Sequence, residues 1–141
     1  MTPETMETAQ STILLIDDDA SFRRVLGRRL EQQGFRVVDA EDGEEGLRIA
    51  EELLPDLILL DIMMPKMKGR EVCALLKAKP NTRRIPVIFL SALGLADHIS
   101  AGMRLGADDY IVKPFHAAQL KERISVCLAR RDSQAMRKPD R

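Results

Sequence analysis

Four short apolar runs in this chain each end at a polar side chain, and this pattern restricts the fold more than any other feature. The runs and the polar residues that follow them are 13–16 before Asp17, 57–60 before Asp61, 87–90 before Ser91 and 110–112 before Lys113. Runs rich in Val, Ile and Leu without alternation are typical of parallel strands covered on both faces. Because parallel strands end at one edge of a sheet, where open α/β sheets bind ligands, we expect the polar groups to converge there.

Helical patterns separate the apolar runs, so strands and helices alternate five times along the chain. In chain order the expected elements are strand 13–16, a helix through 22–30 ended by Gly34, strand 36–38, a helix from Asp42 to before Pro55, strand 57–60, a helix through 72–76, strand 87–90, helix 96–105, strand 109–112 and a helix through 120–128. Short linkers between such elements imply right-handed crossovers, with helices on both faces of one parallel sheet. The expected fold class is therefore α/β.

Length and charge limit what the chain can do. Its 141 residues make one domain of ordinary size. Its 22 basic and 22 acidic residues leave no net charge to attract nucleic acid or an anionic membrane. The first ten residues contain neither a basic cluster nor an apolar core, and no later stretch is long enough to span a bilayer. We expect a cytoplasmic protein with no direct nucleic-acid or membrane partner.

Residues 11–131 are expected to form the folded domain. Residues 1–10 would be a flexible N-terminal tail, and residues 132–141 a C-terminal tail or the start of a linker, since both are poor in large apolar residues. Cys73 and Cys127 lie far apart, form no CxxC pair and fall on apolar faces of expected helices. Both are expected to be buried, reduced thiols without a part in any mechanism.

Carboxylates, a hydroxyl and a lysine at one sheet edge suit a site that holds Mg²⁺ and handles a phosphoryl group, with Asp61 as the reacting carboxylate. Several short motifs contain these residues: ILLIDDD from Ile13 to Asp19, DIMMP from Asp61 to Pro65 followed by Gly69, Ser91-Ala92, GADDY from Gly106 to Tyr110, and KPF from Lys113 to Phe115. Together these motifs are specific. From about residue 12 to 131 the chain resembles a receiver domain of the two-component response regulators.

The resemblance implies a five-stranded parallel sheet of order 2-1-3-4-5 in a flavodoxin-like three-layer sandwich. It also implies that Asp61 is phosphorylated by a phosphohistidine of a sensor histidine kinase or a histidine phosphotransfer protein. Lys113 would pair with Asp61 in the empty site and with the phosphoryl oxygens in the loaded one, and Ser91 would donate its hydroxyl to those oxygens. The Lys113-Pro114 peptide is expected to be cis. Such a domain is a signalling module, which catalyses only its own phosphorylation and dephosphorylation.

The resemblance further implies a Mg²⁺ cofactor, because a carboxylate attacks an anionic phosphate poorly unless a cation screens the charge. In the family, the metal is ligated by the second acid of the pair, by the phosphoacceptor and by the backbone carbonyl two residues past it. The corresponding groups are Asp18, Asp61 and the carbonyl of Met63. Asp17 would act through a metal-bound water, while Asp19 is better placed to cap the following helix.

A response to phosphorylation is implied as well. A phosphoryl group on Asp61 would draw Ser91 inward and let Tyr110 turn in, altering the surface formed by the fourth helix, the fifth strand and the last helix. That surface would contact a downstream effector, an output domain outside this chain, or a second copy in a homodimer. Charges that could pair across the dimer are Arg104, Asp108, Asp109, Lys121 and Arg123. Met63 and Leu93, both apolar and two residues past Asp61 and Ser91, predict a long-lived phosphorylated form.

Two other interpretations stay open. A magnesium-dependent phosphatase of the haloacid dehalogenase type would use Asp17 and Asp19, but its lysine should precede the acidic pair, whereas Lys113 follows it, and Asp61 would have no role. A receiver-like module that only binds partners would keep the fold and lose the chemistry. Phosphate turnover without a kinase would favour the first, and absence of phosphorylation the second.

Overall fold

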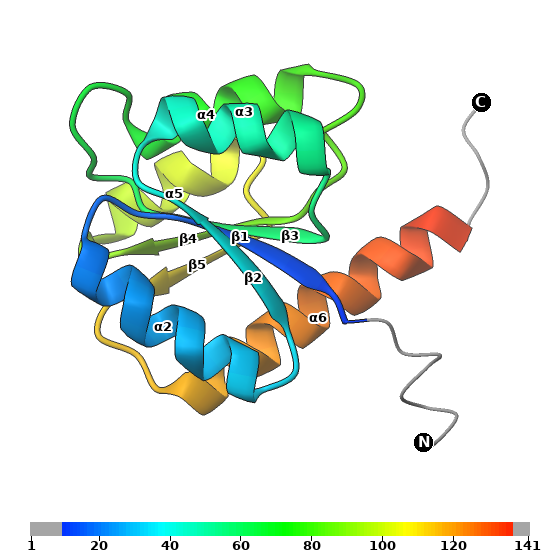
Figure 1. Ribbon diagram of the computed structural model, residues 1–141. Helices are drawn as coiled ribbons and strands as arrows, with labels where there is room; N and C mark the ends of the chain where they lie inside the picture. Colours follow the sequence, from blue (N-terminus) through cyan, green and yellow to red (C-terminus); the bar gives the residue numbers. More distant parts are fainter. Residues whose placement is uncertain (1–9, 137–141) are drawn as a thin grey trace.

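Five strands form one parallel sheet in the order β2-β1-β3-β4-β5, which confirms the predicted order (Figure 1). The computed structural model describes residues 10–136, so nearly all of the predicted N-terminal tail, and residues 137–141, lie outside the described residues. The strands are β1 (Thr12–Ile16), β2 (Arg36–Ala40), β3 (Leu57–Leu60), β4 (Val87–Ser91) and β5 (Asp109–Val112). The helices are α2 (Ala20–Gln32), α3 (Gly43–Leu53), α4 (Gly69–Ala78), α5 (Ala96–Arg104) and α6 (Ala117–Met136).

The helices cover both faces of the sheet and give a three-layer molecule (Figure 1). On one face, Leu14 and Ile16 of β1 share a core with α3, α4 and α5. On the other, Ile13 and Leu15 share a core with α2 and α6. Successive residues of a strand point to opposite faces, so a strand buried between two layers needs an apolar residue at every position. The predicted α/β fold class is confirmed.

The element bounds agree closely with the pattern of apolar residues, although several elements extend beyond the expected ranges. The predicted strand 36–38 continues to Ala40, which pairs with Ile16 at the end of β1. The last helix continues to Met136, past residue 131, where we placed the end of the domain; that boundary stays a prediction. Within residues 10–136, no helix combines the length and the apolar character that crossing a bilayer requires.

Acidic side chains begin the two helices that follow β1 and β2. The Asp19 carboxylate accepts a hydrogen bond from the backbone N–H of Phe22 at 3.1 Å, which confirms the predicted cap of α2. The Asp42 carboxylate accepts from the N–H of Glu45 at 2.9 Å, and the Glu45 carboxylate accepts from the N–H of Glu41 at 2.9 Å. The latter pair closes an arrangement close to the predicted capping box.

Both cysteines are buried and free, as predicted. Burial raises the pKa of the Cys73 thiol and of the Cys127 thiol to about 11. Thiols with such pKa values stay protonated near neutral pH and are poor nucleophiles.

Gly69, the first residue of α4, lies against the backbone of the loop that follows β3. A Cβ atom at this position would lie 2.1 Å from the carbonyl oxygen of Asp61 and 2.8 Å from Cα of Ile62. The Gly69 N–H donates to the Ile62 carbonyl at 3.0 Å, so the two backbone segments are directly bonded. No side chain fits between them, and the loop carrying Asp61 keeps its path only with glycine at position 69.

We predict that Gly69→Ala lowers the free energy of unfolding by about 1–3 kcal/mol, because backbone atoms must move to admit the methyl group. Gly27→Ala is the matched control. Its Cβ would meet only Val37 at an ordinary 3.8 Å, and alanine in a helix interior should stabilise α2 by roughly 0.5–1 kcal/mol. Urea unfolding of both variants measures the difference. Equal stability of Gly69→Ala and wild type would contradict the close approach.

Candidate functional site

The ends of β1, β3, β4 and β5 meet at one edge of the sheet. Ile16 lies beside Leu60 in the register of β1 and β3. The ladder continues past the strand ends, since the N–H of Asp61 donates to the Ile16 carbonyl at 3.0 Å and the N–H of Lys113 donates to the Ser91 carbonyl at 2.8 Å. The polar residues that follow the strands are therefore brought to this edge, as predicted.

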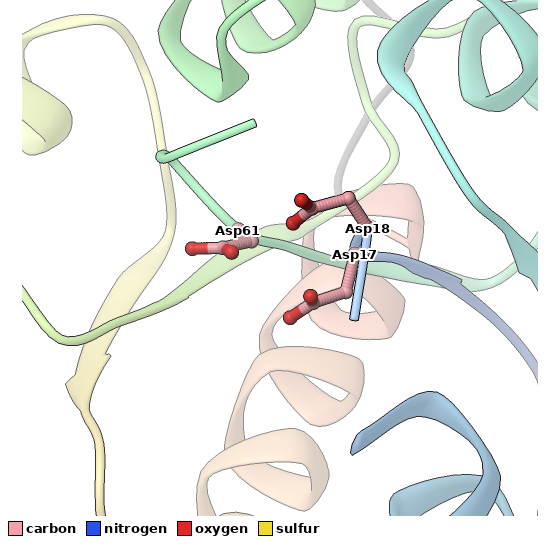
Figure 2. A group of neighbouring side chains, drawn as sticks. All are labelled: Asp17, Asp18 and Asp61. Carbon is pink, nitrogen blue, oxygen red and sulfur yellow. The ribbon is translucent and has the colours of Figure 1, made fainter. Parts of the chain in front are cut away.

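Asp17, Asp18 and Asp61 form a cluster of carboxylates at this edge (Figure 2). One carboxylate oxygen from each lies within 4.8 Å of those of the other two. Asp17 and Asp61 are buried, whereas Asp18 is exposed. Three oxygen ligands with no nitrogen or sulfur among them are the donor set that hard cations such as Mg²⁺ prefer, so these residues fit the implied cofactor.

The side chain of Asp17 is held by two hydrogen bonds. Its Oδ1 accepts from the N–H of Asp19 at 2.9 Å, and its Oδ2 accepts from Nζ of Lys113 at 2.9 Å. Asp19 lies outside the carboxylate cluster, because its own carboxylate caps α2. The three consecutive aspartates thus have different environments, and among the described residues Asp18 has no hydrogen bond or ion pair to its carboxylate.

Lys113 lies nearer to Asp17 than to Asp61. Its Nζ is 3.9 Å from Oδ2 of Asp61, a full ångström further than from Asp17, and 4.0 Å from the centre of the Phe22 ring. The Lys113-Pro114 peptide is cis, as predicted. The ammonium group offsets part of the negative charge of the cluster, and the face of Phe22 provides a favourable surface for the cation.

The surroundings of Asp61 change the protonation of its carboxyl group. Burial and the neighbouring Asp17 carboxylate raise its pKa, while Lys113 and the N–H groups of Met63 and Ile62 oppose the rise; the resulting pKa is about 6. The N–H of Met63 lies 3.3 Å from Oδ1 of Asp61, and the Met63 side chain is 54% exposed. A carboxylate that is costly to ionise in the free protein is one that a bound cation stabilises strongly.

Ser91 and Tyr110 both lie inward. Ser91 is fully buried, and its Oγ accepts from the N–H of Leu93 at 3.1 Å. The Tyr110 hydroxyl donates to the carbonyl of Leu93 at 2.6 Å, and its ring lies 5.8 Å from that of Phe89. Tyr110 is thus already in the position to which we expected it to turn after phosphorylation.

Arg23 was not found by reasoning from the sequence. Its guanidinium donates to the Asp17 carbonyl at 2.7 Å and to the Asp39 carboxylate at 2.8 Å. Arg23 lies four residues after the cap Asp19, in the first turn of the helix beside the site. This spacing is visible in the sequence and could have indicated Arg23. Its pairing with a residue of β2 depends on the packing of α2 on the sheet.

Comparison with known proteins gives a consistent result. Residues 13–125 match the response regulator receiver domain family. The probable transcriptional regulator ycf27 of Guillardia theta is 44% identical over 131 residues, which are 92% of this chain and 50% of that protein. The DNA-binding dual master transcriptional regulator RpaA of Synechocystis sp. is 42% identical over 120 residues, which are 85% of this chain and 46% of that protein.

A solved structure is similar as well. The receiver domain of sensor histidine kinase PA1611 from Pseudomonas aeruginosa has a magnesium ion coordinated in its active site cleft. It superimposes with a TM-score of 0.80 at 31% sequence identity, over 86% of this chain and 99% of that one.

The chain belongs to the receiver domain family of the two-component response regulators. This membership confirms the resemblance and sets aside the phosphatase of the haloacid dehalogenase type. The chain spans about half the length of the two regulators compared above.

The raised pKa of Asp61 predicts a pH-dependent effect of Asp61→Asn on stability without metal. The folded protein holds the proton of Asp61 up to about pH 6, whereas an ordinary aspartate loses it near 3.8. The stability contributed by this proton is present below about pH 4 and is lost as the pH rises through 6. Asp61→Asn removes the ionisable group. Its free energy of unfolding at pH 7 in EDTA should exceed that of wild type by up to about 3 kcal/mol.

Urea unfolding at pH 4.5 and pH 7 measures this difference in the free energy of unfolding. The difference should grow with pH because Asp61 ionises in wild type alone, whereas the other titrating groups are common to both proteins. Addition of Mg²⁺ at pH 7 should stabilise wild type more than Asp61→Asn and narrow the gap. A variant less stable than wild type at pH 7 in EDTA would contradict the burial cost assigned to the Asp61 carboxylate.

Proposed function

We propose that this receiver domain works in a phosphorelay, in which Asp61 takes a phosphoryl group from a phosphohistidine in a Mg²⁺-dependent reaction. The donor would be a sensor histidine kinase or a histidine phosphotransfer protein. The observation that carries the proposal is the buried Asp61 carboxylate, grouped with Asp17 and Asp18 and within 3.9 Å of the Lys113 ammonium. Phosphoryl transfer to a carboxylate requires an acceptor, ligands for a metal ion and a positively charged side chain that binds the phosphoryl oxygens.

The transfer is a displacement at phosphorus. A carboxylate oxygen of Asp61 forms the new P–O bond, the P–N bond to the donor histidine breaks, and the histidine nitrogen keeps the electron pair. Lys113 moves from Asp17 toward the incoming phosphoryl oxygens, and the Ser91 hydroxyl donates to another of them. The product is an acyl phosphate, and the domain acts on no further substrate.

Asp18, Asp61 and the backbone carbonyl of Met63 are the proposed metal ligands, with Asp17 contributing through a water molecule. Bound Mg²⁺ would screen the charge between the Asp61 carboxylate and the phosphoryl group. The carboxylate cluster supports this assignment for the three aspartates. The exposure of Asp18 leaves the cation accessible to solvent, which suits an ion that keeps several waters.

Incubation with Mg²⁺ and acetyl phosphate, followed by intact-mass measurement, tests the proposal. We expect a gain of one phosphoryl group in wild type that is absent in Asp61→Ala and absent in EDTA. Asp18→Ala should fold and lose phosphorylation at low Mg²⁺. No gain in wild type at saturating Mg²⁺ would instead favour a module that only binds partners, and a label on Asp17 would contradict the role of Asp61.

This domain offers an apolar surface beside Lys113 on which the partner that carries the phosphohistidine would dock. A hollow of about 550 Å³ lies between α2 and the chain before α6, lined among others by Phe22, Val25, Phe115 and Arg29. Val25 is 58% exposed there, although it is aliphatic. A partner docked at this hollow would approach the phosphoacceptor from the lysine side.

We predict that Val25→Glu leaves labelling by acetyl phosphate unchanged and slows transfer from the cognate kinase, because only the protein donor needs the apolar contact. Rates of phosphorylation by the two donors, measured on the same preparation, give the ratio. Equal slowing with both donors, or no effect with either, would contradict docking at this hollow.

The proposed output is a change in the surface of α5, β5 and α6. Ser91 would leave its bond to the N–H of Leu93 and bond a phosphoryl oxygen instead. The inward Tyr110 hydroxyl donates to the carbonyl of the same Leu93, so a shift of Leu93 would change the position of Tyr110. A downstream effector, an output domain outside this chain or a second copy would contact this surface.

Both acidic residues expected to pair across a dimer already have partners within the chain. Asp108 pairs with Lys77 and accepts from the N–H of Val87, and Asp109 pairs with Arg123. Both pairs would have to open or rearrange for these acids to bind a second copy. A homodimer on this surface therefore stays a proposal, which the molecular mass in solution with and without phosphorylation tests.

The apolar residues Met63 and Leu93 predict slow loss of the phosphoryl group, because neither side chain can orient an attacking water. Met63→Asn supplies a polar side chain at an exposed position and should shorten the half-life severalfold, whereas Met63→Leu should leave it unchanged. The decay of the phosphorylated mass after removal of acetyl phosphate measures both. Loss of the label from wild type as fast as from Met63→Asn would contradict this account.

A further inference from the structure

Arg23 links the acidic loop of the site to the second strand. Its side chain is 14% exposed, which is low for an arginine near the surface of a helix. One terminal nitrogen donates to the backbone carbonyl of Asp17 at 2.7 Å, and Nε donates to the Asp39 carboxylate of β2 at 2.8 Å. The guanidinium is therefore held between the acidic loop and β2.

The bond to the Asp17 carbonyl bears directly on Asp18. The carbonyl of Asp17 and the N–H of Asp18 belong to one planar peptide group, so holding the oxygen fixes the plane from which Asp18 departs. Among the described residues, Asp18 has no hydrogen bond or ion pair to its carboxylate. With no side-chain partner, Asp18 is placed only through its backbone, which sets the direction of its Cα–Cβ bond, and Arg23 bonds the peptide that leads into it.

We infer that Arg23 is a positioning residue for metal binding, which holds Asp18 in the direction that a divalent cation needs. The inference rests on the proposed function, in which Asp18 ligates the cation directly. Arginine suits the role because its planar fork offers donors in two directions, to a carbonyl and to a carboxylate. The single ammonium of lysine lacks that fixed pair of directions.

The positioning role and the plain charge of Arg23 predict opposite effects. A guanidinium near the site repels a divalent cation, so loss of its charge alone would raise Mg²⁺ affinity. Loss of positioning would lower the affinity, by roughly tenfold, the low end for residues that orient metal ligands. The sign of the change in affinity therefore separates the two.

Calorimetric titration of Mg²⁺ into wild type, Arg23→Ala and Arg23→Lys tests the inference. We expect both variants to bind Mg²⁺ about tenfold more weakly than wild type, since lysine keeps the charge and not the geometry. Asp39→Asn keeps Arg23 and weakens only its bond to residue 39, so this variant should lose less Mg²⁺ affinity than the Arg23 variants. Arg24→Ala is the matched control, because Arg24 is an exposed arginine on the same helix.

Labelling by acetyl phosphate gives a second readout. In Arg23→Lys the Mg²⁺ concentration for half-maximal labelling should rise about tenfold, while the rate at saturating Mg²⁺ stays close to that of wild type. A purely structural role would lower the melting temperature and leave this concentration unchanged. Circular dichroism melts in EDTA establish that each variant is folded at the titration temperature.

Unchanged or tighter Mg²⁺ binding by both folded Arg23 variants would overturn the inference and leave the proposed function intact. An equal loss of affinity in Arg24→Ala would also overturn it, because that change removes charge and not the bond to Asp17. A wild-type chain that binds no Mg²⁺ would contradict the proposed function itself.

Discussion

The parallel register of the strands brings acidic groups together that would otherwise repel one another, and the rest of the site depends on this constraint. Ile16 and Leu60 end two adjacent strands side by side, so the residues after them begin at the same edge. β1 and β3 cannot slip, because both are buried on both faces and a shift of one residue would exchange the two cores. Apolar packing far from the site thus supplies the energy that keeps the carboxylates close.

The cost of that arrangement is concentrated on Asp61. Burial is the main reason that its pKa is raised to about 6, and the neighbouring Asp17 carboxylate adds to the rise. Lys113 reduces this cost from one side, although it lies nearer to Asp17, and Arg23 anchors the backbone of the acidic loop from another. Such a site would gain free energy from a divalent cation, and in the proposed function this cation and Lys113 bind the oxygens of the phosphoryl group that Asp61 accepts.

The fold could be predicted from the sequence because its signals are local. Apolar runs indicated the strands, and Asp19, Gly34 and Pro55 indicated where helices begin or end. The edge of the sheet followed from the strands being parallel, so the grouping of Asp17, Asp18 and Asp61 could be expected from the order of residues along the chain.

The parts that could not be predicted are contacts between residues distant in sequence. Nothing local indicates that Arg23 reaches Asp39 of β2, or that Lys77 at the end of α4 pairs with Asp108 before β5. Lys113 was expected to pair with Asp61, and the preference for Asp17 depends on distances of a single ångström. The inward position of Tyr110 likewise depends on a hydrogen bond to a backbone carbonyl, which carries no sequence signal.

In the proposed function, this edge of the sheet is a single divalent cation site that includes the phosphoacceptor Asp61. A crystal of the protein soaked in Mn²⁺ and measured at the manganese absorption edge tests it most directly. The account predicts one anomalous peak within about 2.3 Å of an oxygen of Asp18, an oxygen of Asp61 and the Met63 carbonyl, with Asp17 one water further away. A peak bound to Asp17 and Asp19 without Asp61, or no peak in this cluster, would contradict it.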